Sequence, residues 1–414
     1  MKNKKVPRKE ILGTNLNLKR SGDIRSQIVA PYFKQTLYPS RKVFMDQIVW
    51  SRSPVRIDLA GGWTDTPPYS MTDGGRVINM AINVNGQEPL QVFVKPTPEL
   101  HIILRSIDAG LDEKITSLDI LEEFDKVGSP FSIPKAALCL CGLSPKFNTH
   151  VFKSLEEYLK QLGYGIELTM LSCIPAGSGL GTSSLLCSAC LGALSNFFGF
   201  EWSLEEIAQR TLAVEQLLTT GGGWQDQFGG MYGGIKVIES EASILQQPYA
   251  TTLPNTLFTD PLYGSYHMLY YTGITRTAKN ILVEIVNRVI DQDIQTLDIL
   301  REIKTHSYAV EHAIKKGDIT TYGSLLKEAW ELNKRLDSGV STPEIEYLIS
   351  AIDDWALGYK LPGAGGGGYL YIVAKDLKAV NLIKKTLEND FIKKKNARLS
   401  EMSLSLKGLQ VTSS

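Results

Sequence analysis

The stretch from Pro175 to Ser184, Pro-Ala-Gly-Ser-Gly-Leu-Gly-Thr-Ser-Ser, combines the residue types that proteins use to bind anions. Its glycines permit positive φ angles and let backbone N–H groups come close to a ligand. The hydroxyl residues at its end are expected in the first turn of a helix, where unpaired N–H groups and the helix dipole favour negative charge. We therefore predict a phosphate-binding loop, against the alternative of an ordinary strand-to-helix connection.

Two common nucleotide-binding motifs do not describe this loop. A P-loop requires Gly-Lys-Ser/Thr, and the dipeptide Gly-Lys occurs nowhere in the chain. The dinucleotide fingerprint requires glycine where Thr182 stands. A second glycine-rich stretch, Leu361 to Tyr369, does contain G-x-G-x-x-G, but a strand-like sequence follows it instead of a helix. Neither stretch is therefore expected to belong to a Rossmann-type domain.

Two carboxylates further along the chain have the settings of functional acids. Glu215 falls on the apolar side of a helix that begins with the capping box Ser203-x-x-Glu206. Burying a lone charge is costly, so Glu215 is expected to meet either a basic side chain or a metal ion. Asp226 is surrounded by amides and glycines in Gly-Gly-Gly-Trp-Gln-Asp-Gln-Phe-Gly-Gly. That setting favours a ligand-facing loop over a simple turn residue.

The elements that must position these residues follow from hydrophobic periodicity. The segment 185–198 has no charged side chain and predicts a buried helix that ends near Gly199. A Pro- and Thr-rich link at 248–254 is expected to lead into a second lobe. Strands are expected at 55–59, 78–84, 90–94, 101–107, 166–172, 265–271 and 402–406, and helices in the second lobe at 278–290, 296–315, 318–335, 343–356 and 377–389.

Composition limits the classes of protein. The chain has 414 residues, enough for two lobes with a cleft, and 44 Lys and Arg balance 44 Asp and Glu, so no nucleic acid or membrane is expected as a partner. Residues 1–45 hold eleven basic and two acidic side chains and are interpreted as an extended basic arm. The five cysteines lack a paired spacing, and no apolar run is long enough for a signal peptide or a membrane span. A cytoplasmic protein with reduced thiols is therefore expected.

Three motifs together resemble the signatures of the GHMP kinases. The first is Ser53 to Asp65, Ser-Pro-Val-Arg-Ile-Asp-Leu-Ala-Gly-Gly-Trp-Thr-Asp, the second is the stretch 175–184, and the third is Leu-Pro-Gly-Ala-Gly-Gly-Gly-Gly at 361–368. The resemblance covers about residues 48–410. Thr182 stands where serine is more frequent in the family, which keeps the hydroxyl group.

Within that family, Gly61 to Tyr69 and Gly221 to Gln227 are most similar to the fucokinases. The resemblance includes no counterpart of the pyrophosphorylase half of the bifunctional fucokinases, so that second activity is not expected. It implies an enzyme that transfers a phosphoryl group from ATP to a sugar, with Mg²⁺ as the metal. It also implies a two-lobe α+β fold, with an N-terminal α/β lobe that carries the ATP site and a ferredoxin-like C-terminal lobe. The expected domains are 1–45 (extension), 46–252 and 253–414.

The roles that the resemblance implies agree with the chemistry of the motifs. Asp226 would be the base that accepts the proton of the sugar hydroxyl, and Arg56 would lie beside it and offset charge on the transferred phosphoryl group. Ser183 and Glu215 would hold Mg²⁺. The residues implied for ATP are Pro175, Gly177, Ser178, Gly179, Leu180, Gly181, Thr182, Ser183 and Ser184. Those implied for the sugar are Arg56, Gly62, Trp63, Asp65, Trp224, Asp226, Gly365 and Gly366.

The segment 61–75 indicates which sugar to expect. It contains Asp65 and Asp73 but neither Lys nor Arg, so it suits neutral hydroxyl groups, and Trp63 adds a flat apolar surface for the methyl group of a 6-deoxy sugar such as L-fucose. A heptose phosphate would need cations, which Arg56 and Arg276 would have to supply. The three motifs would also be compatible with a galactose-type kinase, or with a sugar sensor that lacks catalytic activity.

Overall fold

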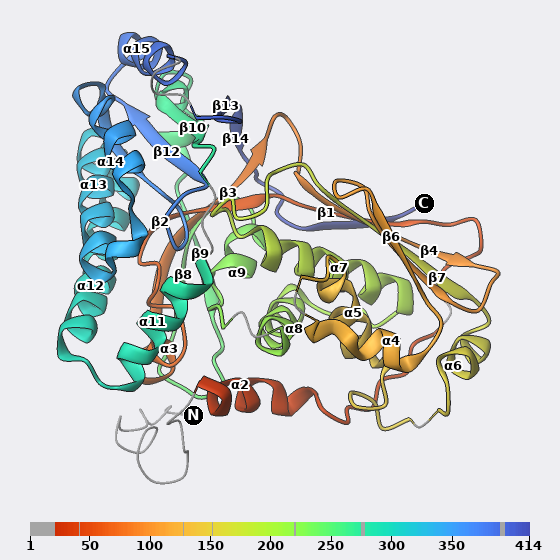
Figure 1. The fold of residues 1–414 in the computed structure, drawn as a ribbon. Helices are drawn as coiled ribbons and strands as arrows, with labels where there is room; N and C mark the ends of the chain where they lie inside the picture. The colour runs from red at the N-terminus through yellow and green to blue at the C-terminus, as the bar shows by residue number, and fades with distance from the viewer. Residues whose placement is uncertain are drawn as a thin grey trace.

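The described residues form two lobes that contain three β-sheets between them (Figure 1). The computed structural model describes residues 21–40, 42–126, 128–150, 152–218, 221–274, 278–389 and 394–414. Residues 1–20 of the predicted basic arm, and Arg276, lie outside these ranges. Two sheets belong to the N-terminal lobe, and the third belongs to the C-terminal lobe with its row of long helices. No helix in the described ranges is long and apolar enough to cross a membrane.

Helices surround the sheets in both lobes. They are α2 (Ser21–Val29), α3 (Tyr69–Asp73), α4 (Leu118–Glu122), α5 (Ser132–Leu138), α6 (Leu155–Leu162), α7 (Thr182–Phe198), α8 (Leu204–Leu217), α9 (Gln225–Met231), α10 (Thr256–Thr259), α11 (Ala278–Ile290), α12 (Ile294–Lys316), α13 (Ile319–Leu336), α14 (Pro343–Ser350) and α15 (Leu377–Leu387). Shorter helical turns are η1 (Ala30–Tyr32), η2 (Glu123–Asp125), η3 (Cys139–Leu143), η4 (Tyr263–Tyr266), η5 (Ser338–Val340) and η6 (Asp353–Trp355).

The six-stranded sheet of the N-terminal lobe contains the strand that leads into the glycine loop. Its spatial order is β15 (Gln410–Ser413), β1 (Val49–Ser53), β4 (Leu90–Thr97), β7 (Gly165–Ser172), β5 (Ile102–Ser106) and β6 (Leu111–Ile115). Neighbouring strands are antiparallel, except that β5 and β7 are parallel. In β4, buried Leu90, Val92 and Val94 alternate with partly exposed residues. One face of the sheet therefore packs inward, on the side where α5 and α7 lie (Figure 1).

The second sheet of the N-terminal lobe contains β2 (Val55–Ala60), which carries Arg56. It pairs with one edge of β3 (Gly75–Val84), while β8 (Ile235–Ser240), β9 (Tyr249–Leu253) and β14 (Met402–Leu404) complete the sheet. All six residues of β2 are buried, although the sequence alternates apolar and polar residues. The polar side of β2 is buried because it contacts the glycine loop and the C-terminal lobe through Arg56 and Asp58.

The C-terminal lobe has the ferredoxin-like arrangement that the resemblance implied. Its sheet has the order β11 (Ala356–Lys360), β12 (Tyr369–Ala374), β10 (His267–Tyr271) and β13 (Arg398–Ser400). In chain order, helices separate β10 from β11, and α15 separates β12 from β13. This is the β-α-β-β-α-β sequence of elements that defines the fold.

Caps at the end of α7 and at the start of α8 confirm the predicted boundaries of the two helices. Helix α7 ends at Phe198 and is capped by Gly199, whose φ of 72° lies in the left-handed region that glycine adopts readily. Helix α8 begins after Ser203, whose side chain accepts a hydrogen bond from the backbone of Glu206. Helix α7 has no charged residue, and most of its side chains are buried.

Three predictions for the second half of the chain are corrected. The link expected at 248–254 contains β9, because Tyr-Ala-Thr-Thr-Leu has high strand propensity and adds to β8. The helix expected at 343–356 ends at Ser350, and Ala356 begins β11. The strand expected at 402–406 is β14, which pairs with β3 of the N-terminal lobe instead of closing the C-terminal lobe.

The described part of the predicted basic arm packs against the N-terminal lobe. Val29 and Val43 belong to the main core, and the backbone of Ser40 donates to Phe198 O at 2.9 Å. The Arg210 guanidinium donates to Gln35 and lies over the ring of Trp202, 3.9 Å from its centre. Some of the described residues between 21 and 45 thus pack on the N-terminal lobe, whereas others, such as Tyr38 and Phe44, are exposed.

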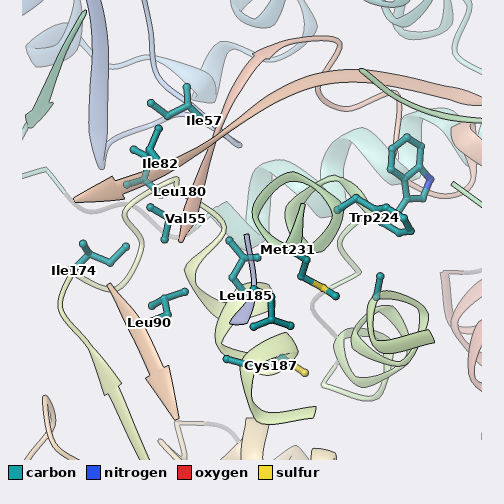
Figure 2. Packing of buried hydrophobic residues seen from close by; sticks show 14 of the residues in the cluster. Val55, Ile57, Ile82, Leu90, Ile174, Leu180, Leu185, Cys187, Trp224 and Met231 are labelled. Atoms are coloured by element: carbon teal, nitrogen blue, oxygen red, sulfur yellow. The ribbon is translucent and has the colours of Figure 1, made fainter. Parts of the chain in front are cut away.

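Buried apolar residues around the start of α7 hold the glycine loop in position (Figure 2). Leu180, inside the loop, is fully buried and lies in this cluster with Val55 and Ile82. The loop is thereby anchored to the second sheet, and the backbone of Arg56 donates to Leu180 O at 3.1 Å. Cys187 and Cys190 are buried in the same helix, and all five cysteines of the chain are free.

Candidate functional site

A cavity of about 310 Å³ is lined by residues of both lobes and by all three motifs. Its lining residues are Arg56, Trp63, Asp65, Thr66, Gly177, Ser178, Gly179, Gly181, Thr182, Ser183, Ser184, Glu215, Gly222, Gly223, Gln225, Asp226, Leu282, Gly363 and Ala364. The sequence motifs lie far apart in the chain, and the fold brings them to one place. Volumes of this size are typical of small-molecule sites.

The glycine loop has the geometry expected of an anion site. Gly177, Gly179 and Gly181 all have φ between 70° and 77°, and α7 begins directly afterwards at Thr182. A Cβ atom on Gly179 would lie 2.6 Å from Pro362 O, so glycine is required for the two glycine loops to approach each other. The backbone of Tyr369 donates to Ser178 O at 2.9 Å, which joins the loops of the two lobes.

Arg56 and Asp226, which both line the cavity, form an ion pair. Arg56 Nε and Nη2 donate to Asp226 Oδ1 at 2.9 and 2.7 Å, and Nη1 donates to Gly179 O at 2.6 Å. Arg56 is 3% exposed, whereas the Asp226 side chain is 25% exposed. The arginine therefore fixes the carboxylate relative to the phosphate-binding loop while leaving it accessible to a substrate.

Asp226 lies in a helix instead of the loop predicted for it. Helix α9 begins at Gln225, so Asp226 is in its first turn. The glycines after it serve packing, because a Cβ on Gly229 would lie 3.0 Å from the Asn79 side chain and one on Gly230 would lie 2.5 Å from Leu185. These two residues of α9 bring the helix close to β3 and α7.

A second carboxyl group, Glu215, shares a hydroxyl with Asp226. Ser184 Oγ donates to Glu215 Oε1 and also lies 3.2 Å from Asp226 Oδ2. Burial and the nearby charge of Asp226 raise the pKa of Glu215 from 4.5 to about 8. The hydroxyl beside Glu215 is that of Ser184, whereas Ser183, which was expected to share a metal with Glu215, is exposed at the cavity wall.

Asp65 and Trp63 contribute buried polar atoms to another part of the cavity wall. Asp65 is 1% exposed, its Oδ2 accepts from the backbone of Gln225 at 3.2 Å, and its Oδ1 has no hydrogen-bond partner among the described residues. Burial, with the charge of Asp226, raises the pKa of Asp65 to about 7. Trp63 is 6% exposed, and within the described ranges its Nε1 also has no partner. Buried donors and acceptors of this kind are normally satisfied by a ligand or by water.

Several residues predicted for the site do not line the cavity. Trp224 is 1% exposed and its Nε1 donates to Gln246 at 2.7 Å, so its ring packs in the core (Figure 2). Gly365 and Gly366 contact Val340 instead, through a close backbone approach and a hydrogen bond. Pro175, Gly62 and the buried Leu180 are also absent from the lining.

The cavity also contains residues that sequence reasoning missed. Thr66, Gln225 and Leu282 line it. Gln225 was visible as a polar residue next to Asp226, whereas Leu282 lies on an amphipathic helix whose pattern has no functional signal. Beside the cavity, Lys360 Nζ donates to Asp58 Oδ2 at 2.9 Å, and both side chains are 1% exposed. This buried ion pair joins β2 to the residue that precedes the third glycine motif.

The oxygen atoms around Glu215 fit a magnesium ion. No group of three or more His, Cys, Asp and Glu side chains suited to a metal lies in the described ranges. Mg²⁺, however, is usually held by one or two carboxylates together with waters and substrate phosphates. Glu215 and Asp226 supply two carboxyl groups around one serine hydroxyl, and the raised pKa of Glu215 reflects, besides burial, negative charge that a dication would neutralise.

Comparison with known proteins assigns the family. Residues 149–234 match the GHMP kinases N terminal domain, and residues 310–393 match the GHMP kinases C terminal domain. The fold is also that of a D-glycero-D-manno-heptose 1-phosphate kinase from Bacteroides thetaiotaomicron, with a TM-score of 0.63 over 88% of this chain and 98% of that one at 19% identity. This chain belongs to the GHMP kinase family, as its three motifs predicted.

Two relatives with higher sequence identity are both named as fucokinases. The chain is 55% identical over 376 residues to the L-fucokinase/L-fucose-1-P guanylyltransferase of Bacteroides fragilis, covering 91% of this chain and 40% of that protein. It is 32% identical over 360 residues to the bifunctional fucokinase/GDP-fucose pyrophosphorylase of Arabidopsis thaliana, covering 85% of this chain and 32% of that protein. The chain thus spans less than half the length of these two relatives.

Proposed function

We propose that this chain is an ATP-dependent sugar kinase that converts L-fucose to L-fucose 1-phosphate, in the salvage route to GDP-fucose. The observation that carries the proposal is the 55% identity, over 91% of the chain, to a protein named for L-fucokinase activity. The cavity supports it, because it combines an anion-binding loop with a carboxylate that is fixed by arginine and open to a substrate.

In the proposed reaction, Asp226 is the general base. Its carboxylate takes the proton of the sugar hydroxyl as the hydroxyl oxygen bonds to the γ-phosphorus and the bond to ADP breaks. Arg56 holds Asp226 in place and puts positive charge next to the glycine loop, where it offsets the charge of the transferred group. The N–H groups of residues 177–184 hold the phosphates of ATP.

Mg²⁺ is the proposed cofactor, with Glu215 and the serine hydroxyls at 183 and 184 as the groups around it. When bound, Mg²⁺ neutralises charge on the β- and γ-phosphate oxygens of the nucleotide. Glu215 lies in α8 and Ser184 in the first turn of α7, so packing of these two helices sets the separation of the two side chains. Ionisation of Glu215, which burial disfavours, becomes favourable beside the cation.

For the sugar, we propose Asp65 and Trp63 as the principal contacts. Oδ1 of Asp65 and Nε1 of Trp63, which have no partner in the described part of the chain, offer an acceptor and a donor for sugar hydroxyls in a buried setting. The heptose phosphate alternative lacks support here, because Arg56 is the one cation among the described lining residues and it is already paired with Asp226.

We also propose a division of the chain near residue 253, with β14 and β15 returning to the first unit, and a cytoplasmic location. The location rests on the five free cysteines, four of them buried, which suit a reducing compartment. The division rests on the change from the β8–β9 pair to the β10 sheet at this point of the chain.

Release of ADP with a panel of sugars tests the proposed function. L-Fucose, L-galactose, D-galactose and a heptose 7-phosphate are compared at saturating MgATP, and kcat/KM is expected to be highest for L-fucose. In Asp226→Asn, which keeps the size and removes the proton acceptor, kcat should fall by ~10² to 10⁴. Higher kcat/KM for the heptose phosphate, or undiminished turnover in Asp226→Asn, would contradict the substrate or the base, respectively.

A further inference from the structure

Helix α9, which carries Asp226, is too short to hold its own position. It has seven residues, and two of them are Gly229 and Gly230. Isolated helices of this length do not persist in water, and glycine lowers helix stability further. The position of Asp226 must therefore be set by contacts that hold α9 at both of its ends.

The carboxyl end of α9 has carbonyl groups without partners inside the helix, as every helix end does. Lys236, in the following strand β8, reaches back to this end. Its Nζ donates to Gly229 O and to Tyr232 O, both at 2.5 Å. A third carbonyl of the same end, Met231 O, accepts from the backbone of Leu409 at 2.9 Å. Lys236 thus supplies two of the three hydrogen bonds described at this end.

Lys236 differs from the other buried lysines in having no carboxylate partner. Lys135 pairs with Glu113 at 2.7 Å and Lys360 pairs with Asp58 at 2.9 Å, whereas no Asp or Glu of the described residues forms an ion pair with Lys236. Its side chain is 1% exposed, and burial lowers its pKa to about 7. The ammonium and the neutral amine both carry N–H donors, so the contacts with α9 persist in either form.

Burying the amine of Lys236 costs more free energy than burying an apolar side chain, so its presence indicates a structural role. The strand positions indicate what that role is. Lys236 faces Asn79 across the β3–β8 pair, and Asn79 packs against Gly229 of α9. The amine therefore connects the sheet to the end of α9 opposite Asp226, while Arg56 and the contact from the backbone of Gln225 to Asp65 hold the beginning of the helix.

We propose that Lys236 is a positioning residue that anchors the end of α9 to β8 and thereby fixes Asp226 against Arg56 and the glycine loop. The proposal rests on the proposed role of Asp226 as the base. Lys236 does not line the cavity. Its effect passes entirely through the placement of the helix, and a displacement of about 1 Å at the reacting group is enough to cost ~10²-fold in rate.

The anchor itself is tested by hydrogen exchange of the amides at 225–231 in the substrate-free protein. Lys236→Met keeps the apolar stem and removes both donors, so exchange in α9 should become at least ~10-fold faster. Lys236→Gln, which keeps an NH₂ donor group on a shorter side chain, should have an intermediate effect, and it serves as the test variant if Lys236→Met does not fold. Lys135→Met is the matched control, because it removes another buried lysine far along the chain from α9 and should leave exchange in 225–231 unchanged. Unchanged exchange in the Lys236 variants would overturn the proposal.

The consequence for catalysis is tested by a double-mutant cycle on kcat. Lys236→Met should lower kcat by ~10- to 100-fold with KM for ATP changed less than about threefold, because the phosphates are bound by the glycine loop. In an Asp226→Asn background the same substitution should change kcat by less than about threefold, because the group being positioned has been removed. Equal losses in both backgrounds would indicate general destabilisation and overturn the proposal, as would faster exchange in α9 with undiminished kcat. If the base assignment is itself wrong, Asp226→Asn alone keeps normal turnover, which separates that failure from this one.

Discussion

Replacing Glu215 with glutamine should make the ligand-free protein more stable relative to wild type as the pH rises. Burial raises the pKa of Glu215 from 4.5 to about 8, so between these values the folded protein keeps a proton that the unfolded chain has lost. The free energy of unfolding of wild type therefore falls with rising pH through this window. Each pH unit in which one proton is retained only in the folded state is worth about 1.4 kcal/mol, so Glu215 costs wild type about 2 kcal/mol between pH 6 and pH 8.

Glu215→Gln lacks this titration, and its amide oxygen can still accept from Ser184. The free energies of unfolding of both proteins are measured with urea at pH 6 and pH 8, in EDTA and without nucleotide. From pH 6 to pH 8, the free energy of unfolding of the variant should rise by about 2 kcal/mol relative to that of wild type. Glu205→Gln, in the first turn of the same helix, is the control and should show no such change, because the pKa of Glu205 is lowered by its bond from Tyr232. A difference that stays constant, or that moves in favour of wild type, would refute the argument that burial retains the proton.

Three further predictions concern the site and the contact between the lobes. Glu215→Gln should raise the Mg²⁺ concentration needed for half-maximal rate, because a neutral amide is a poorer ligand for a hard cation; an unchanged Mg²⁺ titration would remove Glu215 from the metal site. Trp63→Ala should narrow the ratio of kcat/KM between L-fucose and L-galactose, since the methyl group loses an apolar contact of about 1–3 kcal/mol, and a ratio equal to that of wild type would show that the methyl group lies elsewhere. Asp58→Asn should lower the free energy of unfolding in urea by about 3–5 kcal/mol, because it leaves the buried Lys360 charge without its partner, and Asp58→Asn combined with Lys360→Met should lose less; equal losses would show that the pair is not coupled.

The sequence predicted the loop and the buried acid of the candidate site where chemistry restricts the choice of residue. Positive φ angles and close approaches favour glycine at 179 and 181, so the glycines of the sequence were enough to predict the loop. An acid on the apolar face of a helix, Glu215, could be assigned to a buried site because ordinary packing does not explain it. These features are local, and a single sequence displays them.

Features that depend on distant packing could not be predicted from the sequence. The resemblance implied a sugar contact for Trp224, but the indole Nε1 donates to Gln246, which only the fold brings near. The same motif was interpreted as a loop, although tertiary contacts stabilise a helix there despite its glycines. The serine beside Glu215 is Ser184 because the phase of α7 relative to α8 decides which hydroxyl faces inward.

The return of the chain to its first strand affects how the protein is made. Strand β15 pairs with β1, and Gln47 donates to Ser414 O at 2.7 Å across 367 residues of sequence. At ~5–20 residues per second, a ribosome delivers these partners roughly 20–70 s apart. During that interval the edge of β1 that β15 will cover is open to other strands, which makes it a site for mispairing in the nascent chain. The six-stranded sheet of the N-terminal lobe, although most of its strands are synthesised first, can therefore be completed only after all strands of the C-terminal lobe have been synthesised.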